Sequence, residues 1–305
     1  MPKTSRPHFE IAINGRMIAM GARTLIMGVL NVTPDSFSDG GRYFDADRAI
    51  KHGIALVHQG ADWIDLGGES TRPGSQPVSA DEELKRVLPV IRGLRRELRN
   101  VPISIDTTKA EVAEKALEAG ADIVNDISGL RFDPRIAEIA RRHRTPLILM
   151  HTRGTPENMQ RQSFARDIWR SLTGGIETSI RRALAAGIKR SQLIIDPGLG
   201  FGKPRRQNYE IVAHFASLQR FRLPILIGAS RKSFVRAIVA GEGLDPSRSP
   251  GRGAKSNPDP SLLAMGDAAI VTAAILGGAH IVRVHDPAAI LPAVRIADAI
   301  VAAHR

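Results

Sequence analysis

The sequence predicts an α/β protein, a (β/α)₈ barrel of the TIM type with an N-terminal β-hairpin. Apolar runs of strand length recur along the 305 residues, and segments with helical apolar spacing stand between most of them. Strands that alternate with helices imply a parallel sheet with right-handed crossovers. Eight such units in one chain of this length favour a barrel, for which ~250 residues is typical. A doubly wound open sheet is the alternative fold.

Each expected strand is a short apolar run. The runs are Leu25–Leu30, Asp62–Leu66, Pro102–Asp106, Asp122–Asn125, Pro146–Met150, Leu193–Asp196, Pro224–Gly228 and His280–Val284. Three of them open with proline, a position where a missing N–H is tolerated. Gly60, Gly120 and Gly278 each precede an alanine and then a strand, as glycines that end helices do. This repeat indicates one structural unit used several times.

Helices are expected wherever apolar residues recur at helical spacing between these runs. Such spacing begins at Asp45 and continues over Asp81–Leu98, Lys109–Ala119, Pro134–Arg142 and Ile168–Ala186.

Two segments lie outside the repeated units. Residues 8–20 contain Asn14-Gly15 between apolar residues, which predicts a type I′ hairpin that caps the N-terminal end of the barrel. Residues 241–260 are rich in Gly, Pro and Ser, and we expect a flexible insertion in the seventh unit. The whole chain, residues 1–305, is then a single domain.

Composition excludes several classes of function. The chain has no cysteine, which removes disulfides, thiolate nucleophiles and cysteine-ligated zinc. It has no apolar run near the ~18 residues of a membrane span and no hydrophobic N-terminal signal, so we expect a cytoplasmic protein without a membrane partner. The net charge of +12 raises nucleic acid as a partner. The arginines are scattered without interleaved aromatic residues, so we expect no nucleic acid and instead attraction of small anionic substrates.

Polar side chains follow nearly every expected strand. They are Asn31, Glu69–Arg72, Asp106–Thr108, Asn125–Asp126, His151, Asp196, Ser230–Ser233 and Arg283–Asp286. In a barrel these positions converge on one mouth, where active sites of this fold lie. Helix capping would account equally well for Thr107, Thr108 and Asp126. The full mixture suits a ligand with an amide-like heterocyclic edge and an anionic group, because carboxylates accept N–H donors and basic groups receive anionic oxygens.

The stretch DPGLGFGK, Asp196–Lys203, is not a P-loop, because Pro204 stands where Ser or Thr is required. Its glycines could still let backbone amides and Lys203 approach a ligand.

Ordered motifs along the chain resemble those of the dihydropteroate synthase family. They are NVTPDSFSDGG, GGESTRPG, SIDTTK, VNDISG, LMHTRGTPENMQ, DPGLGFGK, GASRKSF and GAHIVRVHD. The resemblance covers nearly the whole chain from about Leu25. It implies a folate-biosynthesis transferase that condenses (7,8-dihydropterin-6-yl)methyl diphosphate with 4-aminobenzoate, giving 7,8-dihydropteroate and diphosphate, with Mg²⁺ as cofactor.

The resemblance also implies roles for residues. The pterin would be held by Asp106, Asn125, Asp196 and Lys232, with Met150 packed on its ring. Mg²⁺ would bind Asn31, and the diphosphate would contact Thr71, Arg283 and His285. The catalytic residues would be Asp106, Lys232, Arg283 and His285.

The 4-aminobenzoate site would be formed by Arg72, Phe201 and Ser233 and closed by a lid that carries Ser36 and Phe37. Sulfonamides would compete there. The long polar loop after the first strand is then explained as that lid, which excludes water from a reactive cation.

Three positions depart from the family pattern. Leu199 and Thr152 stand where Phe and Met are usual, and Asp267 lies in a segment that lacks an expected arginine. The family commonly associates through its later helices, so we expect a homodimer. Other functions remain open: a pterin-dependent methyltransferase, which would not need STRPG or SRKS; a silent paralogue that binds pterin without turnover; and an RNA-binding protein.

Overall fold

The computed structural model describes residues 6–33, 46–70, 75–155, 159, 164–244 and 258–303. Within these ranges one eight-stranded parallel sheet has the order β8-β7-β6-β5-β4-β3-β10-β9. Its strands are β3 (Leu25–Asn31), β4 (Trp63–Gly67), β5 (Ile103–Asp106), β6 (Ile123–Asp126), β7 (Leu147–Met150), β8 (Leu193–Asp196), β9 (Leu226–Gly228) and β10 (Ile281–Val284). A parallel bridge between Ile195 and Ile225 joins the two edges, so the sheet is a nearly closed barrel. The barrel prediction is confirmed, and the doubly wound alternative is wrong.

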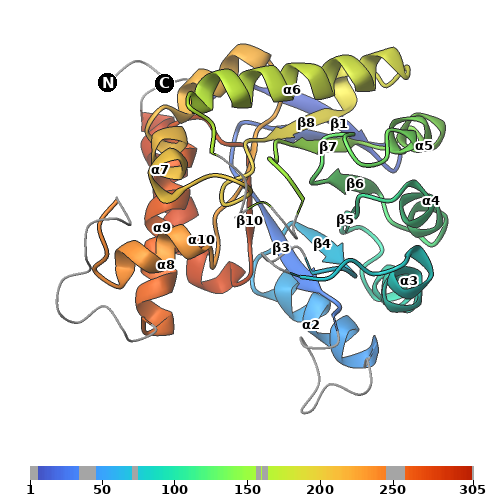
Figure 1. Cartoon of the computed structure of the whole chain (residues 1–305). Coiled ribbons are helices and arrows are strands. Elements are labelled where there is room, and N and C mark those ends of the chain that lie inside the picture. Colours follow the sequence, from blue (N-terminus) through green and yellow to red (C-terminus); the bar gives the residue numbers. More distant parts are fainter. Residues whose placement is uncertain are drawn as a thin grey trace.

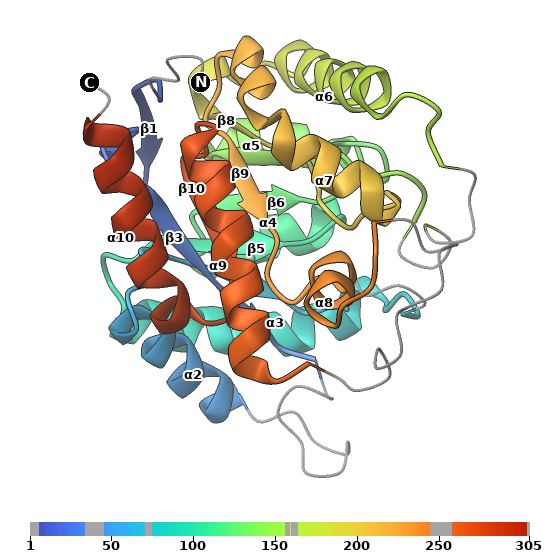
Figure 2. The ribbon, with the colours of Figure 1, turned by 90° about the vertical axis from the view of Figure 1, so that its left-hand side faces the viewer.

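Helices surround the strands (Figure 1). They are α2 (Ala46–His58), α3 (Ala80–Glu97), α4 (Ala110–Glu118), α5 (Arg135–His143), α6 (Ile168–Ala185), α7 (Arg205–Ala213), α8 (Ser233–Val239), α9 (Pro260–Leu276) and α10 (Pro287–Ala303), with short 3₁₀ helices η1 (Arg190–Gln192) and η2 (Phe215–Phe221). The seventh unit carries both α8 and α9, and α9 lies beside α10 (Figure 2). Most of the expected insertion, residues 245–257, lies outside the described residues. None of the helices in the described ranges has the length and apolar character needed to span a membrane.

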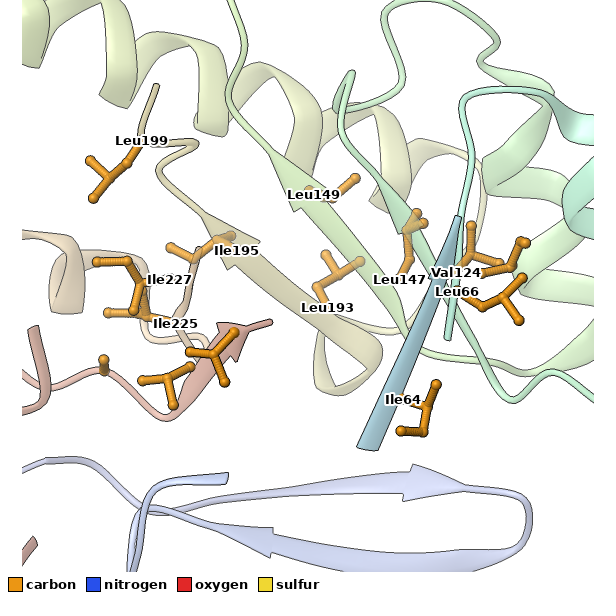
Figure 3. Close-up of a cluster of buried hydrophobic side chains, with 14 of the residues drawn as sticks. Ile64, Leu66, Val124, Leu147, Leu149, Leu193, Ile195, Leu199, Ile225 and Ile227 are labelled. Atoms are coloured by element: carbon orange, nitrogen blue, oxygen red, sulfur yellow. The ribbon is translucent and has the colours of Figure 1, made fainter. Parts of the chain in front are cut away.

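The larger core lies between the sheet and the helices. Successive strand residues point to opposite faces, so Leu147 and Leu149 of β7 face outward while Ile148 and Met150 face the barrel interior. Figure 3 shows part of this outer core, including Leu193 and Ile195 of β8.

The N-terminal hairpin closes one end of the barrel. Strands β1 (Phe9–Ile13) and β2 (Arg16–Met20) pair antiparallel. Asn14 and Gly15 between them have positive φ values of 50° and 74°, as a type I′ turn requires. Ile11, Ile13 and Met20 pack against the inward side chains at the bottom of the barrel, Leu25, Met27, Trp63, Ile123, Ile148, Ile194, Leu226 and Ile281. The predicted cap is confirmed.

Arg6 anchors the start of the chain. It is 2% exposed, donates from Nε to the Gly21 carbonyl at 3.0 Å, and pairs through Nη2 with Asp298 at 2.8 Å. Its Nη1 donates to Thr24 Oγ1 at 2.6 Å. Arg6 therefore joins the segment before the hairpin to α10.

Arg6→Ala should lower the free energy of unfolding by about 3–5 kcal/mol, because it leaves Asp298 without its buried partner. The matched control is Arg23→Ala: Arg23 pairs with Asp62, but its side chain is 60% exposed, and loss of such a pair costs about 0–1 kcal/mol. Urea unfolding followed by circular dichroism measures both. Equal losses for the two variants would contradict the anchoring role.

Candidate active site

The inward-facing ends of the strands gather polar side chains at the carboxyl-terminal mouth of the barrel. Strand pairing places Asp106 beside Asn125 and beside Gly67, and Met150 beside Asp196. These residues come from five neighbouring strands, β4 to β8, and stand at or next to the carboxyl ends of those strands. Arg283 of β10 reaches Asp106 through its long side chain.

Arg283 links two carboxylates across the barrel. Its Nε donates to Asp65 Oδ2 at 2.6 Å, and its Nη2 donates to Asp106 Oδ2 at 2.8 Å. Asn125 Nδ2 also donates to Asp65 Oδ2, at 3.0 Å. Asp65 is fully buried, so it is a fixed counter-charge that orients both Arg283 and Asn125.

Asp65 is the site residue that sequence reasoning missed. It lies in the middle of the strand stretch WIDLG, whereas the predicted site residues stand at or just after the ends of strands. The available signal was a carboxylate inside an otherwise apolar strand, two residues from Trp63 and therefore on the same inward face.

Burial shifts the ionisation of the mouth residues. It raises the pKa of Asp106 to about 7, helped by the negative charge of Asp65 and opposed by Arg283. It raises the pKa of Asp196 to about 6, opposed by the hydrogen bond from the Gly198 amide and by Lys232. Burial and Arg283 lower the pKa of Lys232 to about 8, while Asp196 and Asp106 oppose that change. All three groups therefore titrate within reach of neutral pH.

An apolar wall faces these charges. Ile127, Met150, Met159 and Phe201 form a cluster, and Lys232 Nζ lies 4.0 Å from the centroid of the Phe201 ring. A cavity of about 230 Å³ lies next to this cluster: Asp106 and Ile127 line it together with Glu69, Thr107, Lys109 and Phe132, whereas Phe201, Asp196 and Lys232 do not. Apolar side chains next to a few hydrogen-bonding charges suit a heterocyclic ligand.

The remaining predicted residues lie nearer the rim. Asn31 is the last residue of β3 and is half-buried. A Cβ at Gly67 would lie 3.6 Å from Asp106 Cβ and 3.9 Å from Asn31 Oδ1, so this glycine stands between the two side chains. His285 Nδ1 lies 3.2 Å from Ser230 Oγ, and Ser233 is an exposed residue at the start of α8.

Four predicted site residues lie outside the described residues. They are Ser36, Phe37, Thr71 and Arg72. The lid interpretation and the assignment of Thr71 and Arg72 therefore stay predictions.

The interpretation of Lys203 as a group that approaches a ligand is wrong. Lys203 is 3% exposed, and its Nζ donates to the carbonyls of Gly198 at 2.8 Å, His151 at 3.0 Å and Phe201 at 3.2 Å. Its donors thus hold the glycine-rich turn in place. Position 198 requires glycine, because its φ is +65° and a Cβ there would lie 2.1 Å from the His151 carbonyl oxygen.

Two other residues near the motifs have structural roles. Asp126 accepts hydrogen bonds from the Ser128 amide at 2.8 Å and the Leu130 amide at 2.5 Å, so it stabilises the turn after β6. It does not cap a helix, because α5 begins only at Arg135, with Pro134 as its N-cap residue. Leu199 is fully buried and belongs to the core between sheet and helices (Figure 3). It is not part of the cluster that forms the apolar wall. The family departure at Leu199 therefore changes packing.

Comparisons with known proteins identify the family of the chain. A family model described as pterin binding enzyme matches residues 27–285. The curated dihydropteroate synthase of a Synechocystis species is 45% identical over 280 residues, which cover 92% of this chain and 91% of that protein.

Solved structures give the same result. The Yersinia pestis dihydropteroate synthase, in complex with a sulfonamide drug, superposes with a TM-score of 0.83 at 38% identity, covering 97% of this chain and 100% of that one. The Xanthomonas albilineans dihydropteroate synthase with 4-aminobenzoic acid has a TM-score of 0.83 at 35% identity, covering 96% and 98%. The chain belongs to the dihydropteroate synthase family of pterin binding enzymes.

Proposed function

We propose that this chain condenses (7,8-dihydropterin-6-yl)methyl diphosphate with 4-aminobenzoate, giving 7,8-dihydropteroate and diphosphate in folate biosynthesis. The observation that carries the proposal is the meeting of Asp106, Asn125, Asp196 and Lys232 beside an apolar wall in one barrel mouth. Family membership supports the same reaction. Relatives bound to 4-aminobenzoic acid or to a sulfonamide support the second substrate and sulfonamide competition.

The mouth supplies complementary groups for each edge of a pterin. Ionised Asp196 accepts the paired N–H donors of the aminopyrimidine edge. Lys232 and Asn125 donate to the ring carbonyl and ring nitrogens. Met150 and Phe201 pack on the ring faces. These contacts fix the methylene carbon toward the rim, where Arg283 lies.

Breaking the bond between the methylene carbon and the diphosphate oxygen is the difficult event. It leaves positive charge on the pterin and negative charge on the leaving group. Ionised Asp106 stabilises the first charge. Arg283 uses Nε and Nη2 for Asp65 and Asp106, so Nη1 remains to receive the diphosphate together with His285. We infer a dissociative substitution.

The second substrate needs little activation. An arylamine is neutral at physiological pH and already has its nucleophilic lone pair, so no strong general base is required. Two groups of side chains would orient the amine and exclude water from the cation. They are Ser233 and Phe201, and Arg72 with the lid residues Ser36 and Phe37.

Asn31 fits Mg²⁺ as a ligand. Its amide oxygen is a hard donor, and Mg²⁺ usually takes one or two protein oxygens and completes its shell with substrate phosphates and water. Among the described residues no cluster of three or more His, Asp or Glu side chains could hold a metal alone. When bound with the diphosphate, Mg²⁺ supplies positive charge that stabilises the leaving group.

The proposal includes a cytoplasmic homodimer. Support for the dimer comes from apolar side chains exposed on two neighbouring helices: Leu262 and Met265 of α9, and Ile296 and Ile300 of α10. Sedimentation equilibrium tests this assembly, and a monomer at micromolar concentration would contradict it.

Coupled product formation tests the proposed reaction. Purified protein with the pterin diphosphate and Mg²⁺ should release diphosphate only when 4-aminobenzoate is present, with one 7,8-dihydropteroate formed for each diphosphate. Lys232→Ala should abolish this release, while Lys85→Ala, on the exposed face of α3, should not. Release that does not need the amine, or methyl transfer in its place, would contradict the proposal.

The pH profile of kcat/KM should be bell-shaped, with its maximum between about pH 7 and 8. Activity should rise as Asp196 and Asp106 ionise, because their pKa values are raised to about 6 and about 7. It should fall at higher pH as Lys232, with its pKa lowered to about 8, loses its proton. In the Lys232→Arg variant the guanidinium stays charged, so the decrease in kcat/KM at high pH should move above pH 9. If this decrease occurs at the same pH in Lys232→Arg, a group other than Lys232 causes it.

A further inference from the structure

A second cavity lies beside the mouth, behind Met150. It has a volume of about 310 Å³ and is bounded by the loops after β6 and β7 and by α6. Its polar lining consists of Ser128, Arg131, His151, Thr152, Arg153, Ser171 and Ser179. The described lining contains no Asp or Glu. The proposed reaction uses none of these polar side chains.

The two arginines have no counter-charge in the described part of the chain. Arg131 donates from Nη1 to the Thr152 carbonyl at 2.7 Å, and neither arginine is among the ion pairs of the described residues. Arg153 Nη1 is buried and lacks a hydrogen-bond partner among the described residues. Burial and the nearby charges of Arg182 and Arg153 lower the pKa of Arg131. Cations held together in this way gain stability from a bound anion.

His151 adds an acceptor to this positive site. It is 7% exposed, and its Nδ1 is buried and has no partner within the described residues. Burial, Lys203 and the two arginines lower its pKa well below the usual value, while the Ser171 backbone opposes that change. The low pKa favours the neutral ring, whose Nδ1 is an acceptor when Nε2 carries the proton.

Ser128 adds a donor. Its Oγ accepts hydrogen bonds from the amides of Arg131 at 3.2 Å and Phe132 at 3.3 Å. The hydroxyl hydrogen remains available for a ligand oxygen.

We propose that this cavity is an oxyanion site that selects a phosphate group still carrying an acidic hydroxyl. Arg131, Arg153 and Ser128 take the anionic oxygens, and Nδ1 of His151 accepts the hydrogen bond from the P–OH group. Sulfate has the same shape but no proton at neutral pH, so it leaves Nδ1 facing an anionic oxygen. The cavity is large compared with the ~30 Å³ of one water, so orthophosphate and the larger diphosphate are both candidate occupants.

Calorimetric titration in phosphate-free buffer at pH 7 tests the site. The probes are inorganic phosphate, diphosphate and sulfate, each added to the unchanged protein, to Arg153→Gln and to Arg170→Gln. Arg170 is the matched control, because it is an exposed arginine of α6 outside the cavity lining. Thermal melts of each variant establish that it folds.

The unchanged protein and Arg170→Gln should bind phosphate at least tenfold more tightly than sulfate. Arg153→Gln should lose at least tenfold in phosphate affinity while its melting temperature is unchanged or higher, because a like-charge repulsion is removed. If diphosphate binds more tightly than orthophosphate, diphosphate is the preferred occupant of the cavity. Equal phosphate affinity in Arg153→Gln and Arg170→Gln, or no preference over sulfate, would overturn the proposal. Diphosphate release in the coupled assay tests the proposed reaction separately. The anion-site proposal and the proposed reaction can therefore fail independently of each other.

Discussion

Asp106→Asn should lower kcat/KM for the pterin diphosphate by at least about 100-fold while raising the melting temperature at pH 8. Asparagine keeps the size of the side chain and can still accept a hydrogen bond from Arg283. It cannot carry the negative charge that stabilises the developing pterin cation. Activity and stability should therefore change in opposite directions.

The stability effect follows from the raised pKa of Asp106. Burial and Asp65 raise this pKa from 3.8 to about 7, so the folded state holds a proton that the unfolded chain releases. The contribution of Asp106 to stability is fully present below about pH 4 and is lost as pH rises through about 7. At pH 8 the ionised carboxylate destabilises the fold, and asparagine removes that penalty.

Melts at pH 5 and pH 8 measure this effect. The gain in melting temperature for Asp106→Asn should be larger at pH 8 than at pH 5. Asp81→Asn, at an exposed position in α3, should show no such dependence. A variant that is less stable than the unchanged protein at pH 8 would show that the Arg283 ion pair outweighs burial.

Arg283→Gln should lower the free energy of unfolding by about 3–5 kcal/mol and kcat/KM by about 10²–10³-fold. The substitution leaves Asp65 and Asp106 without the guanidinium that joins them at 2.6 Å and 2.8 Å. It also removes the Nη1 donor proposed to receive the diphosphate. Urea unfolding and the coupled diphosphate assay measure the two losses.

Two further variants separate charge from geometry. Arg283→Lys keeps the charge but cannot donate to both carboxylates in one plane, so its losses should be intermediate. Adding Asp65→Asn to Arg283→Gln should restore most of the stability and none of the activity, because it removes one uncompensated carboxylate. If the double variant stays as unstable as Arg283→Gln, the Asp65 charge is not the source of the instability.

The barrel and most of its mouth could be predicted from the sequence because both depend on local patterns. Alternation along a strand fixes which side chains point inward, and strand ends fix which residues reach the mouth. Asp106, Asn125 and Asp196 satisfy both conditions. Strand pairing then places Asp106 beside Asn125, and Asp196 beside Met150.

Contacts between residues that are far apart in the sequence could not be predicted in this way. Asp65 lies inside a strand, and its pairing with Arg283 spans 218 residues. The direction in which the Lys203 side chain points depends on positive φ values at Gly198, Gly200 and Gly202. The spacing of residues in the sequence does not reveal these φ values. The cavity beside Met150 is formed by loops and one helix whose separation no periodicity specifies.

A crystal structure of this protein with 7,8-dihydropteroate tests the proposed binding mode of the pterin. We expect the pterin ring in the barrel mouth, between Met150 and Phe201, with the methylene carbon facing Arg283. Its edge should lie at hydrogen-bond distance from Asp196, Asn125 and Lys232. A ring bound outside the barrel, or held there with Asp196 and Lys232 out of contact, would contradict it.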